Sequence, residues 1–180
     1  MLERRRSERS FAEPSIEAIS ILLWHAARAQ RATDCAMGYR VSQRPLPSAG
    51  ALHPIHILVE LAPGHGWAVY LPEEHALAVV DGLGASMMPL IQACEDVVPR
   101  QDGRLMFFAA EIGKTAAKYD DPESLVWRDA GVLQAGLALV AAGLDMPFCL
   151  LGVTGEPWIS ALTEQGELMG VGVAVFGARV

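Results

Sequence analysis

The sequence predicts one α+β domain around a single antiparallel or mixed sheet, and three observations support this prediction. The chain has 180 residues, 52% of them hydrophobic, which is enough to bury one sizeable core. Segments with helical and strand patterns follow one another as helix, three strands, helix, strand, helix, strand, an order that is not a simple βαβ repeat. No internal repeat or linker interrupts the sequence, so we expect residues 1–180 to form one domain.

The first half of the chain contains the first helix and three strands. Pro14 precedes apolar residues at helical spacing, which predicts an amphipathic helix from Ile16 to about Arg31. The following segment ATDCAMGY is expected to be a loop. The alternation in IHILVEL, residues 55–61, predicts a half-buried strand, and WAVYL and HALAVV around PEE predict a hairpin.

The second half contains two further helices and two further strands. Helical spacing from Met87 to Val98 predicts one helix, and SLVWRDAGVLQAGLALVAAG predicts a long one closed by Gly143. RLMFFAA and GVGVAVFG are expected to be strands. The segment from Ala130 to Leu144 would span about 22 Å, short of the roughly 30 Å of a membrane core, so we interpret it as a buried helix.

The long helix is apolar on nearly every face, whereas a surface helix needs a polar face. A second subunit is the simplest cover for such a helix in a small protein. The sequence therefore predicts an obligate homodimer.

The charge and the cysteine content of the chain restrict the classes of binding partner that we expect. The formal net charge of −7 disfavours nucleic acid and anionic membranes, and leaves small molecules, peptides or proteins. Three cysteines without a CxxC pair argue against a disulfide framework and a zinc site. The arginine-rich opening MLERRRSERSF is not followed by an apolar signal-peptide core, so we expect mature, cytoplasmic protein.

Two segments have the composition of ligand-binding elements. Arg5, Ser7 and Arg9 alternate in RRRSERSF and, in an extended segment, present two guanidinium groups and a hydroxyl to one anion; the alternative is a solvated basic terminus. The small residues of PLPSAGALHP let the backbone approach a planar ligand, although the segment is also compatible with an ordinary loop before a strand. His53 and His56 lack carboxylates at metal-ligand spacing, so no metal site is predicted.

Two more segments allow a chemical role. Lys118 and Tyr119 precede the long helix and are a possible proton-transfer pair, or else an exposed pair at the start of the helix. The Gly-bounded segment DMPFCLLGVTGEP either lays its backbone along a ring or forms a turn.

Taken in order, these segments resemble the FMN-dependent nitroreductase family. The resemblance rests on the RRSxRxF opening, the helix containing LLWHAARAQR, the PSAG loop with its following proline, the buried helix and the Gly-closed turn before the last strand. Within the family the chain looks most like the dehydrogenases that oxidise azolines to thiazoles and oxazoles in ribosomal peptides. Val132 stands where that branch often has histidine, and Arg179 is the basic residue nearest the usual phosphate-closing position.

The resemblance implies a nitroreductase-like α+β dimer with a mostly antiparallel sheet and FMN in two clefts between the subunits. The phosphate would contact Arg5, Ser7 and Arg9. The partner subunit would line the flavin with Pro47, Ser48, Ala49, Gly50, Leu52 and His53. The isoalloxazine ring would lie against Cys149, Leu150, Leu151 and Gly152, with Gln92 at its pyrimidine edge and Lys118 and Tyr119 as catalytic residues.

Three functional hypotheses follow. The first is a flavin oxidoreductase that transfers a hydride at flavin N5. Its substrate would be an azoline-containing peptide, or a nitro or quinone compound reduced with NAD(P)H. The second is a vestigial flavin-binding partner without turnover, and the third is an unrelated structural dimer. FMN is expected in place of FAD because no GxGxxG turn is present for a dinucleotide pyrophosphate.

Overall fold

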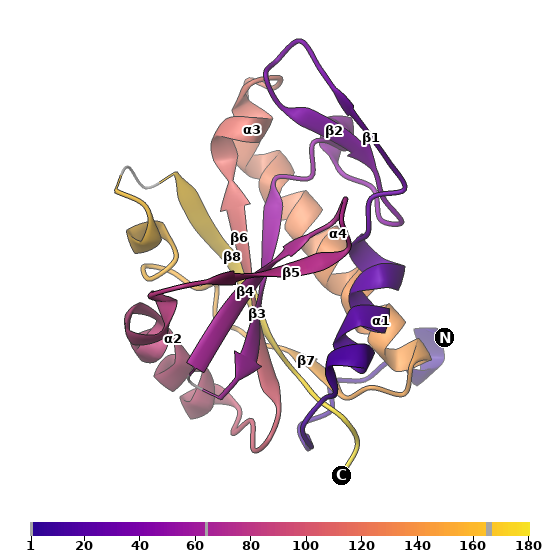
Figure 1. The fold of residues 1–180 in the computed structure, drawn as a ribbon, viewed down its shortest axis with the longest axis vertical. Helices are drawn as coiled ribbons and strands as arrows, with labels where there is room; N and C mark the ends of the chain where they lie inside the picture. The colour runs from indigo at the N-terminus through magenta and orange to yellow at the C-terminus, as the bar shows by residue number, and fades with distance from the viewer. Residues whose placement is uncertain (1, 64, 165–166) are drawn as a thin grey trace.

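The protein is described by a computed structural model that covers residues 2–63, 65–164 and 167–180. Its main sheet has six strands in the order β5-β4-β3-β6-β8-β7, and every neighbouring pair is antiparallel. The strands are β3 (Ile55–Ala62), β4 (His65–Leu71), β5 (Ala76–Val80), β6 (Arg104–Glu111), β7 (Phe148–Leu150) and β8 (Leu168–Phe176). This arrangement confirms the predicted antiparallel sheet (Figure 1).

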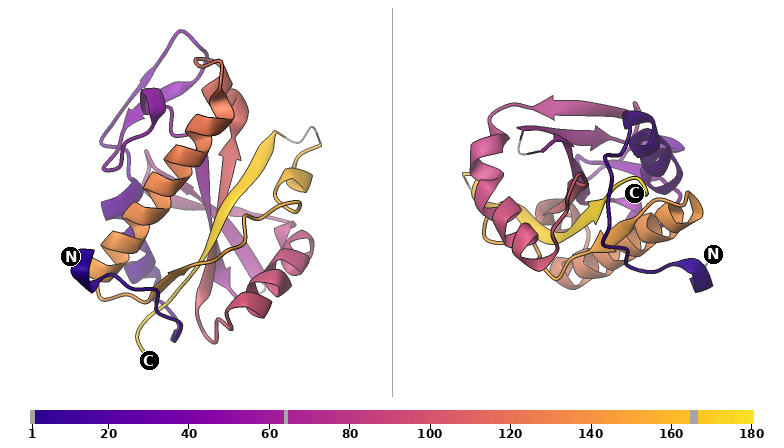
Figure 2. Two further views of the ribbon diagram at one scale, coloured as in Figure 1. Left: turned by 180° about the vertical axis from the view of Figure 1, so that it is seen from behind. Right: turned by 90° about the horizontal axis from the view of Figure 1, so that it is seen from below.

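Helices cover both faces of the sheet and give three layers (Figure 2). One face carries α1 (Ile16–Ala27) and α4 (Pro122–Gly143), whose side chains form one hydrophobic core with the sheet. The other face carries α2 (Leu83–Val97), which packs over a second core that includes Trp67 and Phe107. The short helices are α3 (Ile112–Ala116), η1 (Leu2–Arg4), η2 (Ala49–Ala51) and η3 (Ser160–Leu162).

The central strands are buried on both faces, which corrects the prediction of a half-buried strand at residues 55–61. Ile57 and Val59 face the α1/α4 core, while Leu58 faces the α2 core. Glu60 lies on β3 and is fully buried. A layer on each side of the sheet therefore removes the solvent face that the alternating pattern indicated.

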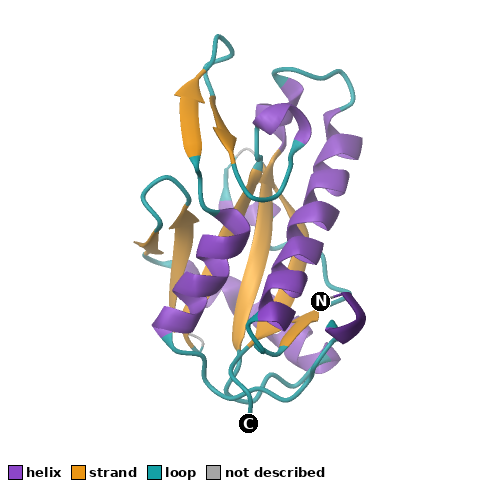
Figure 3. Cartoon of the chain, turned by 90° about the vertical axis from the view of Figure 1, so that its right-hand side faces the viewer, coloured by secondary structure: helices purple, strands orange, loops and turns teal. Residues whose placement is uncertain are grey.

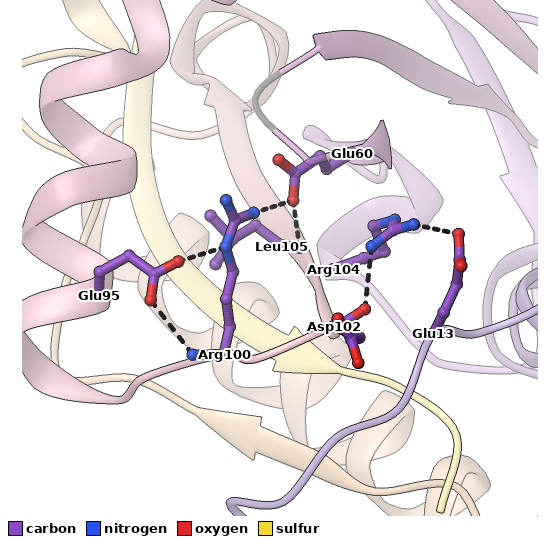
Figure 4. A network of polar contacts seen from close by, with 7 residues as sticks. All are labelled: Glu13, Glu60, Glu95, Arg100, Asp102, Arg104 and Leu105. Atoms are coloured by element: carbon purple, nitrogen blue, oxygen red, sulfur yellow. Dashed lines mark hydrogen bonds and ion pairs between the residues drawn. The ribbon is translucent and has the colours of Figure 1, made fainter.

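A polar network neutralises Glu60 inside the α2 face (Figure 4). Arg100 forms ion pairs with Glu60 and Glu95, and the amide of Leu105 donates to Glu60 at 3.1 Å. Arg104, close to this network, forms an ion pair with Glu13. A buried charge needs such partners, because removal of one leaves the other uncompensated in a medium of low polarity.

The segment after α1 differs from the prediction. The first helix ends at Ala27, because Arg28 is extended (φ −61°, ψ 147°) and its guanidinium donates to the carbonyl of Trp24. ATDCAMGY is not a simple loop: it overlaps β1 (Arg31–Asp34), which pairs with β2 (Arg40–Gln43) in a separate hairpin at one end of the molecule (Figure 3). Its short, polar and mostly exposed strands lack the apolar alternation from which strands are predicted.

The long helix α4 is the core helix of the α1/α4 face. It is 22 residues long and apolar enough to cross a membrane by length and composition, yet 39% of its most apolar window is buried inside the protein. Helix α4 packs against α1, α3, β3, β7 and β8. These contacts bury part of the helix, and Trp127 and Val132 remain exposed in the single chain.

Candidate active site

The RPLPSAG segment is fixed to α4 by a buried carboxylate. Ser48 donates a 2.5 Å hydrogen bond to Asp129, and the amide of Ala49 lies 3.1 Å from both carboxylate oxygens. The Ser48 hydroxyl also accepts from the amide of His53 at 2.9 Å. Asp129 lies next to Arg128 in the largely apolar helix α4, and sequence reasoning did not single it out. A buried carboxylate in a helix requires hydrogen-bond donors from another element.

A second anchor lies farther along the same helix. Leu46 packs directly on Gly136, where an added Cβ would lie 2.2 Å from the Leu46 Cδ1 atom. Asp129 and Gly136 are seven residues apart and share one face of α4. The loop therefore runs along the helix and is attached to it at two points.

The loop backbone then turns through left-handed conformations. Gly50 has φ +61°, and Ala51 and His53 have φ +57° and +47°, a region that residues other than glycine rarely adopt. A Cβ at position 50 would lie 2.8 Å from Lys118 Nζ and 2.9 Å from the Tyr119 hydroxyl. The structure thus places the two candidate catalytic groups directly over the PSAG loop.

Lys118 and Tyr119 follow α3 and precede α4. Their amides both hydrogen-bond to the carbonyl of Thr115 at 3.1 Å, which fixes the turn that carries them. Lys118 is exposed in the single chain and Tyr119 is partly buried, so the removal of Lys118 from water that a lysine base requires is not present within one subunit.

Beside the loop the charges are partly buried. Arg44 contributes its Nε–H to the Ser42 hydroxyl at 2.9 Å, and burial lowers the pKa of its guanidinium to about 10. Burial, followed by the nearby Arg44 and Lys114 charges, lowers the pKa of His53 to about 4. His53 is therefore neutral near pH 7, and its Nε2–H donates to the Ser42 carbonyl at 2.9 Å.

An open groove of about 560 Å³ runs between the β1–β2 hairpin and the loop. Pro47, Ser48, Ala51 and His53 lie on one side of it, and Ala32, Thr33 and Val41 lie on the other. Leu52 is buried beneath the loop. Small or apolar residues make up most of its wall, and Arg31, Gln43 and Arg44 also line it.

The arginine segment lies toward the opposite end of α4 (Figures 1 and 2). Arg4 and Arg6 line a small cavity with Ala138 and Ala142 of α4, and Arg5, Ser7 and Arg9 are not among its lining residues. All five side chains are exposed. Arg179 lies in the same cavity, paired with Glu8 at 3.1 Å and Asp145 at 2.7 Å.

The remaining predicted residues lie elsewhere. Cys149 is buried in the edge strand β7, and Leu150, Leu151 and Gly152 follow along that edge with the Leu151 amide bonded to the Val173 carbonyl. Gln92 is exposed on α2, on the other face of the sheet from α4, and donates to Asp96 at 2.9 Å. A single chain brings the PSAG loop together with Lys118 and Tyr119, but not with the arginines or Gln92.

Sequence comparison finds no match among protein-family models or curated proteins. Comparison of structures finds a component of the E. coli microcin synthetase McbBCD complex, solved with truncated pro-MccB17 bound. The similarity covers 98% of this chain and 70% of that one, at 19% identity and a TM-score of 0.74. A Ralstonia eutropha protein assigned to the nitroreductases matches over 99% and 81% of the two chains, at 20% identity and a TM-score of 0.69.

The chain has the nitroreductase fold. A nitroreductase-type protein of Desulfovibrio desulfuricans, solved in complex with FMN, also matches, with 16% identity, coverage of 99% and 84%, and a TM-score of 0.60. The nitroreductase resemblance that the sequence indicates is thus confirmed for the fold. Sequence reasoning did not include Arg44, Lys114 and Asp129 in the site, because none of them belongs to a short motif and their burial depends on the tertiary structure.

Proposed function

We propose that this chain is an FMN-dependent oxidoreductase that transfers a hydride between its substrate and bound flavin. The observation that carries the proposal is the convergence of Lys118 Nζ and the Tyr119 hydroxyl over Gly50 of a loop that is anchored to α4. The FMN complex among the structural neighbours supports the choice of cofactor.

The residues of the chain fit FMN at two places. Gly50 has no side chain where the two candidate catalytic groups meet, and the groove beside it has a volume of about 560 Å³. Arg5 and Arg9 form no ion pair with any carboxylate in the described part of the chain, so both are free to bind a phosphate. When bound, FMN supplies a ring that accepts or donates a hydride.

The site is proposed to be completed by a second copy of the chain. The loop lies near the start of α4 and the arginines lie near its end, and 22 helical residues extend about 33 Å. A twofold axis across the middle of α4 brings the loop of one subunit toward the arginines of its partner.

Exposed apolar residues on the same layer support this dimer. Trp127 and Val132 of α4 are 42% and 37% exposed, and Ile21 and Trp24 of α1 are 39% and 44% exposed. A paired subunit would cover this face and would also remove water from Lys118 if its contact reaches the PSAG loop.

The chain's own contribution to the reaction is positioning and proton transfer. The Asp129 anchor holds the loop, and Lys118 and Tyr119 each hold or move a proton at Nζ or at the phenol oxygen as the substrate changes oxidation state. We propose a peptide azoline as the substrate. The resemblance of the KY pair to that branch supports this choice, as does the structural similarity to a component of a complex that was solved with truncated pro-MccB17 bound.

Anaerobic mixing of the flavin-loaded protein with an azoline peptide, with NADH and with NADPH tests this function. Bleaching of the flavin by the azoline peptide, with appearance of the azole, is the expected result. Bleaching by NAD(P)H alone assigns the chain to the nitro- or quinone-reducing type. A flavin that none of the three reduces contradicts the enzyme proposal and leaves a non-catalytic flavin-binding protein.

A further inference from the structure

A further cavity, here called the cationic cleft, shares Arg44 and His53 with the groove. Its volume is about 510 Å³, and it is formed by the β2–β3 region, the β4–β5 turn and α3. Apolar and aromatic side chains make up much of its wall, among them Tyr39, Ile55, Ile57, Val69 and Tyr70.

Two cations in the cleft lack a direct counter-ion. The terminal guanidinium nitrogens of Arg44 and the ammonium of Lys114 form no hydrogen bond or ion pair with any residue that the structure describes. Both groups are partly buried, and burial lowers the pKa of each. A partly buried cation without a partner is unfavourable, and an anionic ligand removes that cost.

The other charged residues of the cleft are paired or lie near its rim. Arg40 pairs with Glu73 at 2.9 Å, and His56 lies 3.3 Å from Glu111. Glu73 and Glu74 also line the cleft, and the charges of Glu73 and Glu111 act on Lys114 without forming an ion pair with it. A guanidinium and an ammonium beside an apolar wall suit a monoanion with an apolar body.

We propose that the cationic cleft binds a carboxylate carried on an apolar body, with Arg44 and Lys114 as its two charged contacts. Two kinds of ligand have this chemistry: a small apolar carboxylic acid and the C-terminal carboxylate of a peptide. The cleft shares Arg44 and His53 with the groove of the candidate active site. The inference that the bound carboxylate belongs to the substrate therefore rests on the proposed function. The binding test does not require flavin reduction, so the two proposals fail separately.

Isothermal titration calorimetry of the full chain with 3-phenylpropionate tests the cleft, with 3-phenylpropanamide as the uncharged probe. The acid is expected to bind and the amide is expected to bind at least about tenfold more weakly, since a charge-assisted contact is lost. Acetyl-Ala-Ala-Phe with a free or an amidated C-terminus separates the two sources. Tighter binding of the free-acid peptide than of 3-phenylpropionate assigns the cleft to a peptide terminus, and the reverse order assigns it to a small acid.

Arg44→Gln and Lys114→Gln are each expected to weaken 3-phenylpropionate by about tenfold or more. Arg6→Gln removes the same charge at the other end of α4 and is expected to leave the affinity unchanged. If Arg44→Gln does not fold, Lys114→Gln decides the question, because Lys114 lies on the short helix α3 and its side chain forms no hydrogen bond with any residue that the structure describes. Unchanged affinity in the variants, equal binding of acid and amide, or tighter binding of phenyl phosphate overturns the proposal.

Discussion

Ser48 and Asp129 are 81 positions apart in the sequence and are joined by a 2.5 Å hydrogen bond. Asp129→Ala removes the acceptor for the Ser48 hydroxyl and the Ala49 amide, so we expect the free energy of unfolding to fall by about 2 kcal/mol or more. Urea unfolding measures this change. Glu123→Ala, in the exposed first turn of the same helix, is the control and is expected to cost less than about 1 kcal/mol. Equal midpoints for the two variants would show that Asp129 does not hold the loop.

The Leu46 contact makes Gly136 different from Gly131 on the same helix. Gly→Ala in a helix ordinarily stabilises by about 1 kcal/mol, and a Cβ at Gly131 meets nothing within 4 Å. At Gly136 the added methyl collides with Leu46, so we expect a loss of about 1–3 kcal/mol. Thermal unfolding of both variants checks the contrast. Leu46→Ala in the Gly136→Ala background should recover part of the loss, and an absence of coupling would contradict the packing.

The neutral state of His53 makes stability depend on pH. Its pKa is about 4 in the folded protein and 6.5 without the protein environment. Between these values the unfolded chain binds a proton that the folded chain does not. The free energy of unfolding should therefore decrease as the pH falls from about 6.5 to about 4, with no further contribution from this group above pH 6.5. Urea unfolding over this range should show a shallower dependence for His53→Gln, and identical curves would contradict the burial of a neutral imidazole.

The fold was largely predictable from the sequence, because the central strands and long helices have strong apolar patterns. The β1–β2 hairpin was not, since its strands are polar on both faces. The half-buried strand predicted for residues 55–61 is wrong at Glu60, because the buried Arg100 that forms an ion pair with Glu60 comes from a distant segment.

The candidate site was predictable only as separate segments. The PSAG loop and the Lys118–Tyr119 pair were found by their composition, and the structure joins them through Gly50. Their common anchor, Asp129, required the tertiary structure, because nothing local in the sequence links it to residue 48. Cofactor contacts of the arginine segment, of residues 149–152 and of Gln92 stay predictions, since a single chain does not bring these segments to the loop.

The position of Lys118 and Tyr119 over Gly50 predicts a catalytic effect without a structural one. Lys118→Ala and Tyr119→Phe should lower azoline oxidation by about 100-fold or more, the scale of a lost general acid or base. Flavin content and sedimentation should stay as in the parent protein. Gly50→Ala should lower the same rate, because its methyl group occupies the space of both side chains. If Lys118→Ala and Tyr119→Phe both oxidise the azoline at the rate of the parent protein, the two residues are a surface feature without a catalytic role.

The central claim is that the chain holds FMN, and the cofactor released from the purified protein tests it most directly. We predict a yellow protein that releases FMN, identified by its mass, in an amount stoichiometric with the chain. Combined Arg5→Ala and Arg9→Ala substitutions should leave a folded dimer with little flavin, because the proposed phosphate contacts are lost. A colourless parent protein that does not bind added FMN would contradict the central claim. A double variant with full FMN occupancy would contradict the proposed phosphate site.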